Sequence, residues 1–402
     1  MLEIAQIREA AATLQGRFRR TELIHSHYFS ERVGLPVHFK CENLQRTGSF
    51  KIRGAYNFLA HQPPEVLTNG VLTASAGNHA QGVALAASLL GVPATVVMPE
   101  STPLAKVLAT REYGAEVILH GAGYDDAARR ARQLEAEEGM IFVPAFDHPL
   151  VMAGQGTAGL EIMENLPEVE TLLVPIGGGG LISGIATAAK ALKPSVRVIG
   201  VEAAGAPSAL LSRRKGEVVT LAAARSLADG IVVKRLGELT FPVIESLVDD
   251  LVTVEEEEIA QAIVSLMEKG KLVVEGAGAV SLAALLYRRG TSSWGTTVCI
   301  LSGGNLDVQT MARVVERGMM AEGRFLKVRV ELPDVPGSLA RLTTILAEKK
   351  ANIFHVFHDR RRADVPLDRA EVLLEMETRG PEHIREILEL MDREGYGAEV
   401  LR

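Results

Sequence analysis

The segment that decides the fold is Thr171-Leu-Leu-Val-Pro-Ile-Gly-Gly-Gly-Gly-Leu-Ile-Ser-Gly184. Its first six residues are apolar or β-branched, which predicts a buried strand over 171–176. Four glycines follow, and a helix is predicted directly after them, over Leu181–Leu192. Free backbone N–H groups at the positive end of a helix can hold a phosphate without a cationic side chain, and glycine lets the anion approach closely. The alternative is a merely flexible turn.

The same alternation of short strands with Ala-rich helices runs from the N-terminus to about residue 315. A further helix is predicted over Asp125–Glu138. Such alternation is typical of the α/β class, in which helices cover both faces of parallel-rich sheets. The other expected strands are Gly70–Thr73, Ala94–Met98, Glu116–Leu119, Val196–Val201 and Thr297–Leu301.

The pattern changes near residue 323, and we expect a second domain over residues 323–402. Strands there alternate apolar and polar residues, and the two helices are amphipathic. The order β-α-β-β-α-β is that of the ferredoxin-like unit. The expected elements are Phe325–Leu332, Ser338–Lys350, Asn352–Asp359, Ala370–Thr378, Pro381–Glu394 and Ala398–Leu401.

Composition excludes several classes of protein. The 402 residues carry a net charge of −7 with no basic stripe, which argues against nucleic acid or an anionic membrane as a partner. The two cysteines, Cys41 and Cys299, cannot build a disulfide framework. The N-terminus lacks the basic start and apolar run of a signal peptide, and no run is long enough to span a membrane. We therefore expect a cytoplasmic protein.

A second chemical signal is Lys51, within Thr47-Gly-Ser-Phe-Lys-Ile-Arg-Gly-Ala55. A lone lysine is usually a solvated surface charge. This one stands between Phe50 and Ile52, at the start of an apolar helix. Burial there would lower the pKa of the amine, and the neutral amine is a usable nucleophile toward an aldehyde.

Two more segments follow predicted strands. Ser75-Ala-Gly-Asn-His79 offers small residues and N–H groups at a helix start, which suits a carboxylate ligand. Capping of the helix by Ser75 or Asn78 explains this segment equally well. Ser302-Gly-Gly-Asn305 is a similar turn after a strand and could also be a cap.

Taken together, these segments resemble threonine dehydratases (threonine ammonia-lyases), which are fold-type II pyridoxal-phosphate (PLP) enzymes related to serine racemase and serine dehydratase. The resemblance covers nearly the whole chain and implies a two-lobed catalytic region over residues 1–322, with a small lobe at about 47–150. The tail resembles an ACT regulatory domain. The matching motifs lie at residues 49–55, 75–82, 177–181, 275–279, 302–305 and, in the tail, 332–338.

The resemblance implies a role for each matching residue. Lys51 would hold PLP as a Schiff base and, once released, remove the α-proton of the substrate, with Ser75 close to the α-carbon. Ser302 would meet the pyridine nitrogen; because a hydroxyl cannot stabilise a pyridinium, the ring would be a weaker electron sink and loss of a β leaving group would be favoured. The remaining contacts are to the ring (Phe50, Asn78), the phosphate (Gly177, Gly178, Gly179, Gly180, Leu181) and the substrate carboxylate (Ser75, Ala76, Gly77, Asn78, His79).

Two positions leave alternatives open. Glu275 lies near the ring in relatives, yet its side chain could equally cap a helix. Relatives can bind a divalent cation through a glutamate, a carbonyl and an aspartate, whereas the corresponding residues here are Glu202, Ala206 and Ser208. Because Mg²⁺ and Ca²⁺ favour anionic oxygens, the missing carboxylate weakens such a site and leaves a monovalent or weakly bound divalent cation.

The function implied is PLP-dependent deamination of L-threonine to 2-oxobutanoate, with L-serine as a further substrate. A serine or hydroxyaspartate dehydratase or racemase is the alternative, and a non-catalytic amino-acid-binding regulator is a third. Asp334, Gly337 and Ser338 are candidates for binding an amino-acid effector such as isoleucine, as suits isoleucine biosynthesis. The tail could instead serve only to dimerise, and valine, another effector or none are the alternatives to isoleucine. A homo-oligomer, a dimer or tetramer, is expected in either case.

Overall fold

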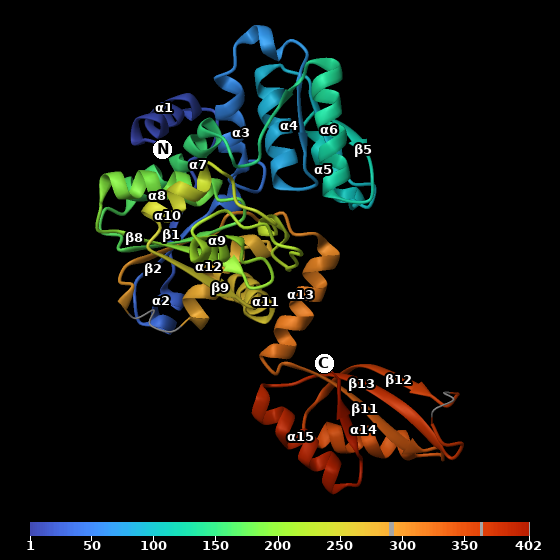
Figure 1. Ribbon diagram of the computed structural model, residues 1–402. Coiled ribbons are helices and arrows are strands. Elements are labelled where there is room, and N and C mark those ends of the chain that lie inside the picture. Colours follow the sequence, from blue (N-terminus) through green and yellow to red (C-terminus); the bar gives the residue numbers. More distant parts are fainter. Residues whose placement is uncertain (289–292, 362–364, 402) are drawn as a thin grey trace. The chain divides into compact units, whose positions relative to one another are not determined.

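The computed structural model describes residues 1–288, 293–361 and 365–401. They form two compact units, residues 1–308 and 309–402 (Figure 1). The expected α/β class with parallel-rich sheets and a ferredoxin-like tail is confirmed. The change of pattern expected near residue 323 falls between the end of α13 (Val308–Ala321) and the start of β11 (Phe325–Pro333).

The first unit contains a small, fully parallel sheet in the order β5-β4-β3-β6. Its side chains alternate between two cores. Val96 faces the core shared with α3 and α4, while Leu72 and Val97 face the core shared with α6. The elements are α3 (Lys51–Ala60), β3 (Val71–Ala74), α4 (Asn78–Leu90), β4 (Ala94–Met98), α5 (Leu104–Glu112), β5 (Glu116–Leu119), α6 (Tyr124–Glu138) and β6 (Ile141–Phe142).

The larger sheet has the order β1-β2-β10-β7-β8-β9 and is parallel except for the β1–β2 pair. Helices α8 and α10 pack on one face, and α12 packs against β7, β8 and β9. The elements are α1 (Ile4–Leu14), β1 (Leu23–His25), α2 (His27–Val33), β2 (Val37–Lys40), α7 (Pro149–Asn165), β7 (Thr171–Pro175), α8 (Gly180–Leu192), β8 (Arg197–Ala203), α9 (Ser208–Lys215), α10 (Thr240–Leu247), β9 (Asp250–Val254), α11 (Glu256–Ser265), α12 (Gly276–Tyr287) and β10 (Thr297–Ile300).

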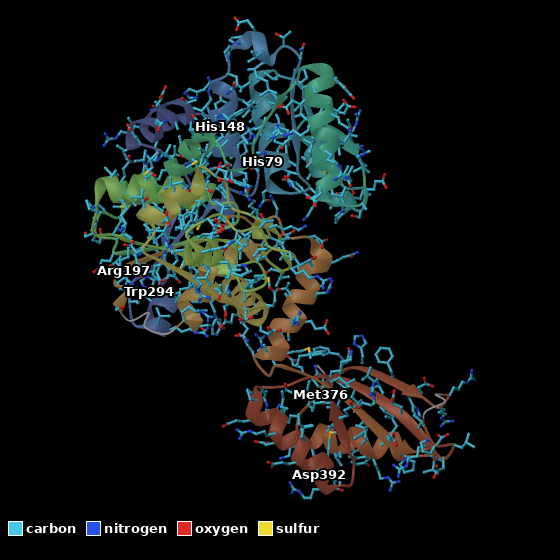
Figure 2. The ribbon with its side chains drawn as sticks, viewed as in Figure 1. His79, His148, Arg197, Trp294, Met376 and Asp392 are labelled. Atoms are coloured by element: carbon cyan, nitrogen blue, oxygen red, sulfur yellow. The ribbon has the colours of Figure 1, made fainter. Side chains whose placement is uncertain are left out.

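The second unit carries an antiparallel sheet in the order β12-β13-β11-β14. Alternate residues of β11 and β13, including Met376 (Figure 2), face the two helices and form the core. Besides β11, the elements are α14 (Ser338–Glu348), β12 (Asn352–Asp359), β13 (Arg369–Glu377), α15 (Pro381–Arg393) and β14 (Ala398–Val400). None of the helices in the described parts of the chain is long and apolar enough to cross a bilayer.

Candidate active site

A cavity of about 1110 Å³ in the first unit gathers the segments that the sequence singles out. Three of them follow the carboxyl ends of parallel strands: residues 75–79 follow β3, 177–181 follow β7, and 302–305 follow β10. Parallel α/β sheets bind their ligands at this edge because loops and helix N-termini meet there. The volume suits a cofactor together with a small substrate.

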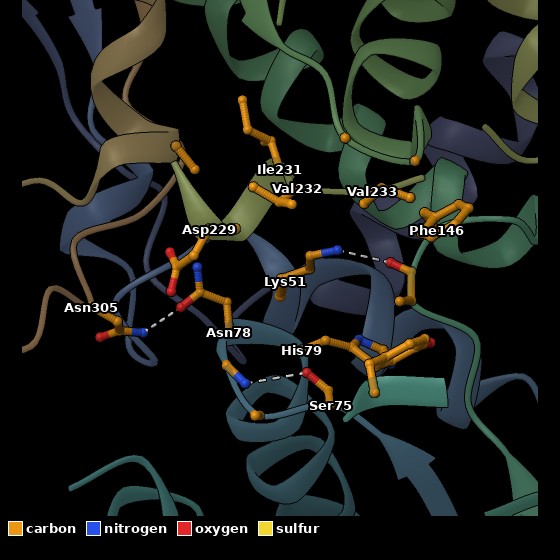
Figure 3. Close-up of a pocket in the computed structure, with 18 of the residues that line it drawn as sticks. Lys51, Ser75, Asn78, His79, Phe146, Asp229, Ile231, Val232, Val233 and Asn305 are labelled. Carbon is orange, nitrogen blue, oxygen red and sulfur yellow. Dashed lines mark hydrogen bonds between the residues drawn. The ribbon is translucent and has the colours of Figure 1, made fainter. Parts of the chain in front are cut away.

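Lys51 opens helix α3 and points into this cavity (Figure 3). Its Nζ donates a hydrogen bond of 3.0 Å to the carbonyl oxygen of Ala145 and lies 5.2 Å from the centroid of the Phe50 ring. Burial lowers the pKa of the amine to about 8, although the nearby Glu275 carboxylate opposes the shift. A fraction of the amine is therefore neutral, as nucleophilic attack on an aldehyde requires.

The four glycines join β7 to α8, and the predicted strand and helix on either side of them are confirmed. Among the described hydrogen bonds, none is donated by the N–H groups of Gly177, Gly178 or Gly179. Free N–H groups at the start of a 13-residue helix suit an anion. The loop thus fits a phosphate group.

The structure adds a second reason for glycine in this loop to the one inferred from sequence. A Cβ on Gly178 would lie 2.4 Å from the ring of Phe146, and one on Gly179 would lie 2.6 Å from the hydroxyl of Thr240. Gly179 also has a φ of 96°, which disfavours other residues. Close packing against protein therefore requires glycine here, in addition to any demand from a ligand.

The segment Ser75–His79 lies at the start of α4 and also lines the cavity. Capping by Ser75 or Asn78 is not what the structure shows, because the N-cap residue is Gly77 and the Ser75 hydroxyl accepts from the N–H of Gly77 at 3.3 Å. His79 is buried, and its Nε2 bonds to the carbonyl oxygen of Val143 at 3.0 Å. Burial, with Lys51 adding to it, lowers the pKa of His79 to about 3, so the imidazole is neutral.

Asn78, Glu275 and Ser302 are also brought together in the cavity wall. Asn78 donates to Oε1 of Glu275 at 2.6 Å, and the Glu275 side chain forms no helix cap. Ser302 is buried, and its hydroxyl donates to the carbonyl oxygen of Ala277 at 3.2 Å. Its own carbonyl accepts from the N–H of Phe50 at 3.1 Å, which ties it to the lysine segment.

The cation candidates lie outside this cavity. The Glu202 carboxylate accepts from the N–H groups of Ala209 and Leu210 at 2.7 and 2.8 Å, at the start of α9. Burial raises the pKa of Glu202 to about 7. Both of its oxygens are thus used by backbone donors, and a cation at Glu202, Ala206 and Ser208 stays a prediction.

Several cavity-lining residues were not anticipated from the sequence. Asp229 to Val233 form one wall, and Gln155 and Phe146 contribute from the segments around α7. Gln155 accepts from the N–H of Gly54 at 3.2 Å. The segment 229–233 has no glycine-rich or charged motif, and only its position in the fold reveals it.

Comparisons with known proteins agree with this geometry. The family model of pyridoxal-phosphate dependent enzymes matches residues 14–303, and that of the ACT domain matches residues 327–389. The chain belongs to the pyridoxal-phosphate-dependent enzymes. The chemistry of the site fits this cofactor: a lysine amine of lowered pKa for the aldehyde and a helix-start glycine loop for the phosphate.

Relatives of this PLP-dependent enzyme include threonine-degrading and racemising members. It is 61% identical, over 402 residues and the full length of both chains, to an L-threonine ammonia-lyase of Geobacter sulfurreducens. The structure of processed threonine deaminase isoform 2 from Solanum lycopersicum matches with a TM-score of 0.75 and 38% identity, covering 79% of this chain and 88% of that one. Maize serine racemase matches with a TM-score of 0.75 and 37% identity, covering 80% and 99%.

Proposed function

We propose that the enzyme is a threonine ammonia-lyase, a carbon–nitrogen lyase that converts L-threonine to 2-oxobutanoate and ammonia and also converts L-serine to pyruvate. The observation that carries the proposal is the half-buried Lys51 amine, of lowered pKa, inside the cavity that the glycine loop lines. The full-length identity of 61% to an L-threonine ammonia-lyase supports the choice of substrate.

PLP, when bound, supplies an electron sink for the charge that develops at the α-carbon of the substrate. Lys51 would hold the cofactor and, once the amine of the substrate had displaced it, its neutral amine would accept the α-proton. The backbone N–H groups from Gly177 to Leu181 would hold the phosphate. Phe50, Asn78, Glu275 and Ser302 would surround the ring. Asn78 would offer it an amide N–H, and Ser302 a hydroxyl rather than a carboxylate.

The substrate carboxylate would be bound by neutral donors. Because the pKa of His79 is near 3, this side chain cannot supply a positive charge. The N–H of Ser75 already donates to the carbonyl oxygen of Val97 at 3.2 Å, and that of Gly77 to the Ser75 hydroxyl. The N–H groups of Ala76 and Asn78, at the start of the 13-residue helix α4, are donors that remain. His79 would contribute by holding this helix start against Val143.

The ACT unit would bind an amino-acid effector at the turn before α14. Asp334 pairs with Arg360 at 3.0 Å, and Gly337, the N-cap residue, has a φ of 90°. The buried hydroxyl of Ser338 has no hydrogen-bond partner among the described residues, which leaves it available to a ligand. Isoleucine would be the effector in a biosynthetic role, and we expect a cytoplasmic homo-oligomer, dimer or tetramer.

The test is an assay of 2-oxo acid formation with threonine and with serine, each with and without isoleucine or valine. We expect turnover of both, with threonine preferred, and complete loss of turnover in Lys51→Ala while the protein stays folded. Turnover near the wild-type rate in that variant would refute the role of Lys51.

A serine racemase is the second candidate, because the maize serine racemase structure matches as well as the threonine deaminase structure does. Chiral analysis of unreacted serine separates the two functions. Formation of D-serine faster than pyruvate would favour the racemase.

A further inference from the structure

A chain of side-chain amides crosses the cavity wall and begins at Asn305, in the turn after β10. Nδ2 of Asn305 donates to the carbonyl oxygen of Thr47 at 2.8 Å and to Oδ1 of Asn78 at 2.8 Å. Nδ2 of Asn78 in turn donates to Oε1 of Glu275 at 2.6 Å. Figure 3 shows the oxygen of Asn78 turned toward Asn305, with its nitrogen on the opposite side.

The hydrogen bonds of these two amides have one donor-to-acceptor direction. The carbonyl of Thr47 can only accept, so Asn305 must turn its nitrogen toward Thr47. The same nitrogen then meets the oxygen of Asn78, which leaves the nitrogen of Asn78 to face the carboxylate of Glu275. The orientation of an amide is set by its hydrogen-bonding network, and here the Thr47 carbonyl fixes the direction because it can only accept.

Two glycines, Gly48 in the lysine segment and Gly303 in the turn after β10, leave space for these hydrogen-bonded side chains. A Cβ on Gly48 would lie 2.2 Å from Oδ1 of Asn305, and Gly48 has a φ of 70°. A Cβ on Gly303 would lie 2.3 Å from Oε1 of Glu275 and 3.0 Å from Nδ2 of Asn78. The lysine segment and the turn after β10 are thus both shaped around these amides.

We propose that Asn305 is a positioning residue that holds Asn78 with its N–H, and not its carbonyl, directed at an oxygen of the cofactor ring. The inference rests on the proposed function in that it takes Asn78 as the ring contact. An amide NH₂ has two donors, and the one not given to Glu275 can serve a ring oxygen. In the reversed orientation, the carbonyl of Asn78 would face that oxygen, and two acceptors repel.

Asn305→Asp tests the donor-to-acceptor direction of these hydrogen bonds, because a carboxylate can only accept from its neighbours. Facing Thr47 and the oxygen of Asn78, it would force the Asn78 amide to reverse. We expect PLP binding about tenfold weaker in a titration of the apo-enzyme, and a shifted visible absorption maximum of the bound cofactor. Asn305→Ala should give the same shift to a smaller extent.

Asn43→Asp is the matched control. Asn43 also donates its amide to a main-chain carbonyl, that of Val273 at 3.0 Å, but it neither lines the cavity nor contacts Asn78. The control should keep the wild-type absorption maximum. Wild-type PLP affinity and spectrum in a folded Asn305→Asp protein would overturn the proposal.

A double-mutant cycle with Asn78→Ala decides whether Asn305 acts through Asn78. In the Asn78→Ala background, Asn305→Ala should change the PLP dissociation constant less than twofold, since its target is gone. Fully additive losses would overturn the proposal. These readouts need no turnover, so an enzyme that binds PLP but fails to deaminate threonine would refute the proposed function and leave this result standing.

Discussion

Lys51 carries a flexible amine at a half-buried position on the cavity wall. Because its pKa is about 8, about half of the amine is neutral at pH 8, whereas a surface lysine would be roughly 0.4% neutral. We expect the rate of PLP uptake by the apo-enzyme to rise with pH and level off above a midpoint near pH 8. Stopped-flow absorbance between pH 6.5 and 9.5 measures this. A midpoint near pH 10 would show that the amine is solvated.

Arg53, two residues further along the chain, is the centre of a buried ionic cluster. Its guanidinium donates to both oxygens of Glu42 and both oxygens of Glu161, and Lys40 also pairs with Glu161. Arg53→Met would leave buried carboxylates with too few cations, and we expect a loss of about 3–5 kcal/mol in the free energy of unfolding. Denaturant unfolding followed by fluorescence or circular dichroism measures it.

The control for Arg53 is an arginine in an exposed pair. Arg20 pairs with Glu164, and the two side chains are 62% and 57% exposed. Arg20→Met should cost about 1 kcal/mol or less, because exposed pairs are screened by water. Equal losses in the two variants would contradict the importance of the buried cluster.

At the level of elements, the start of α10 and the residues just before it donate hydrogen bonds to the glycine loop. The hydroxyl of Thr240 donates to the carbonyl oxygen of Gly178 at 2.7 Å, and the N–H of Gly237 donates to the same oxygen at 3.2 Å. Holding this carbonyl on the far side leaves the N–H groups of the loop free for a phosphate. Thr240→Val should therefore weaken PLP binding about fivefold, while Thr240→Ser should not. Equilibrium titration of the apo-enzymes compares the two.

Elements with a clear pattern could be predicted from the sequence. The strands Ala94–Met98, Glu116–Leu119 and Asn352–Asp359 have the predicted bounds, because apolar or alternating runs there end at turn residues. Strands β1, β2, β6 and β9 were not predicted. In β2, Lys40 is fully buried within the ionic cluster, whereas sequence patterns treat a lysine as a surface residue.

The residues of the candidate site likewise fall into two groups, those that the sequence identifies and those that only the fold reveals. Motifs with an unusual local composition, such as the four glycines and the lysine between apolar residues, could be recognised as chemically special. Phe146, Thr240 and Asn305 act through partners far away in the chain, and no spacing in the sequence shows that Phe146 fills the space beside Gly178. Long-range packing of this kind is determined by the fold as a whole.

For the whole molecule, regulation requires that an effector at the ACT unit changes the binding of substrate in the other unit. Such coupling is reciprocal: if isoleucine weakens threonine binding by some factor, threonine must weaken isoleucine binding by the same factor. We expect this equality in calorimetric titrations of the Lys51→Ala variant, which should bind both ligands without turnover. A threonine dissociation constant that saturating isoleucine leaves unchanged would contradict regulation of substrate binding.

The location of the effector site can be tested in the same intact enzyme. Ser338→Ala removes the buried hydroxyl that has no partner among the residues described, and we expect the isoleucine concentration for half-maximal effect to rise about tenfold. Thr344→Ala is the matched control, since this exposed hydroxyl of α14 only donates to the carbonyl oxygen of Ala340 at 2.8 Å. If both variants respond to isoleucine as the wild type does, the effector does not bind at the turn before α14.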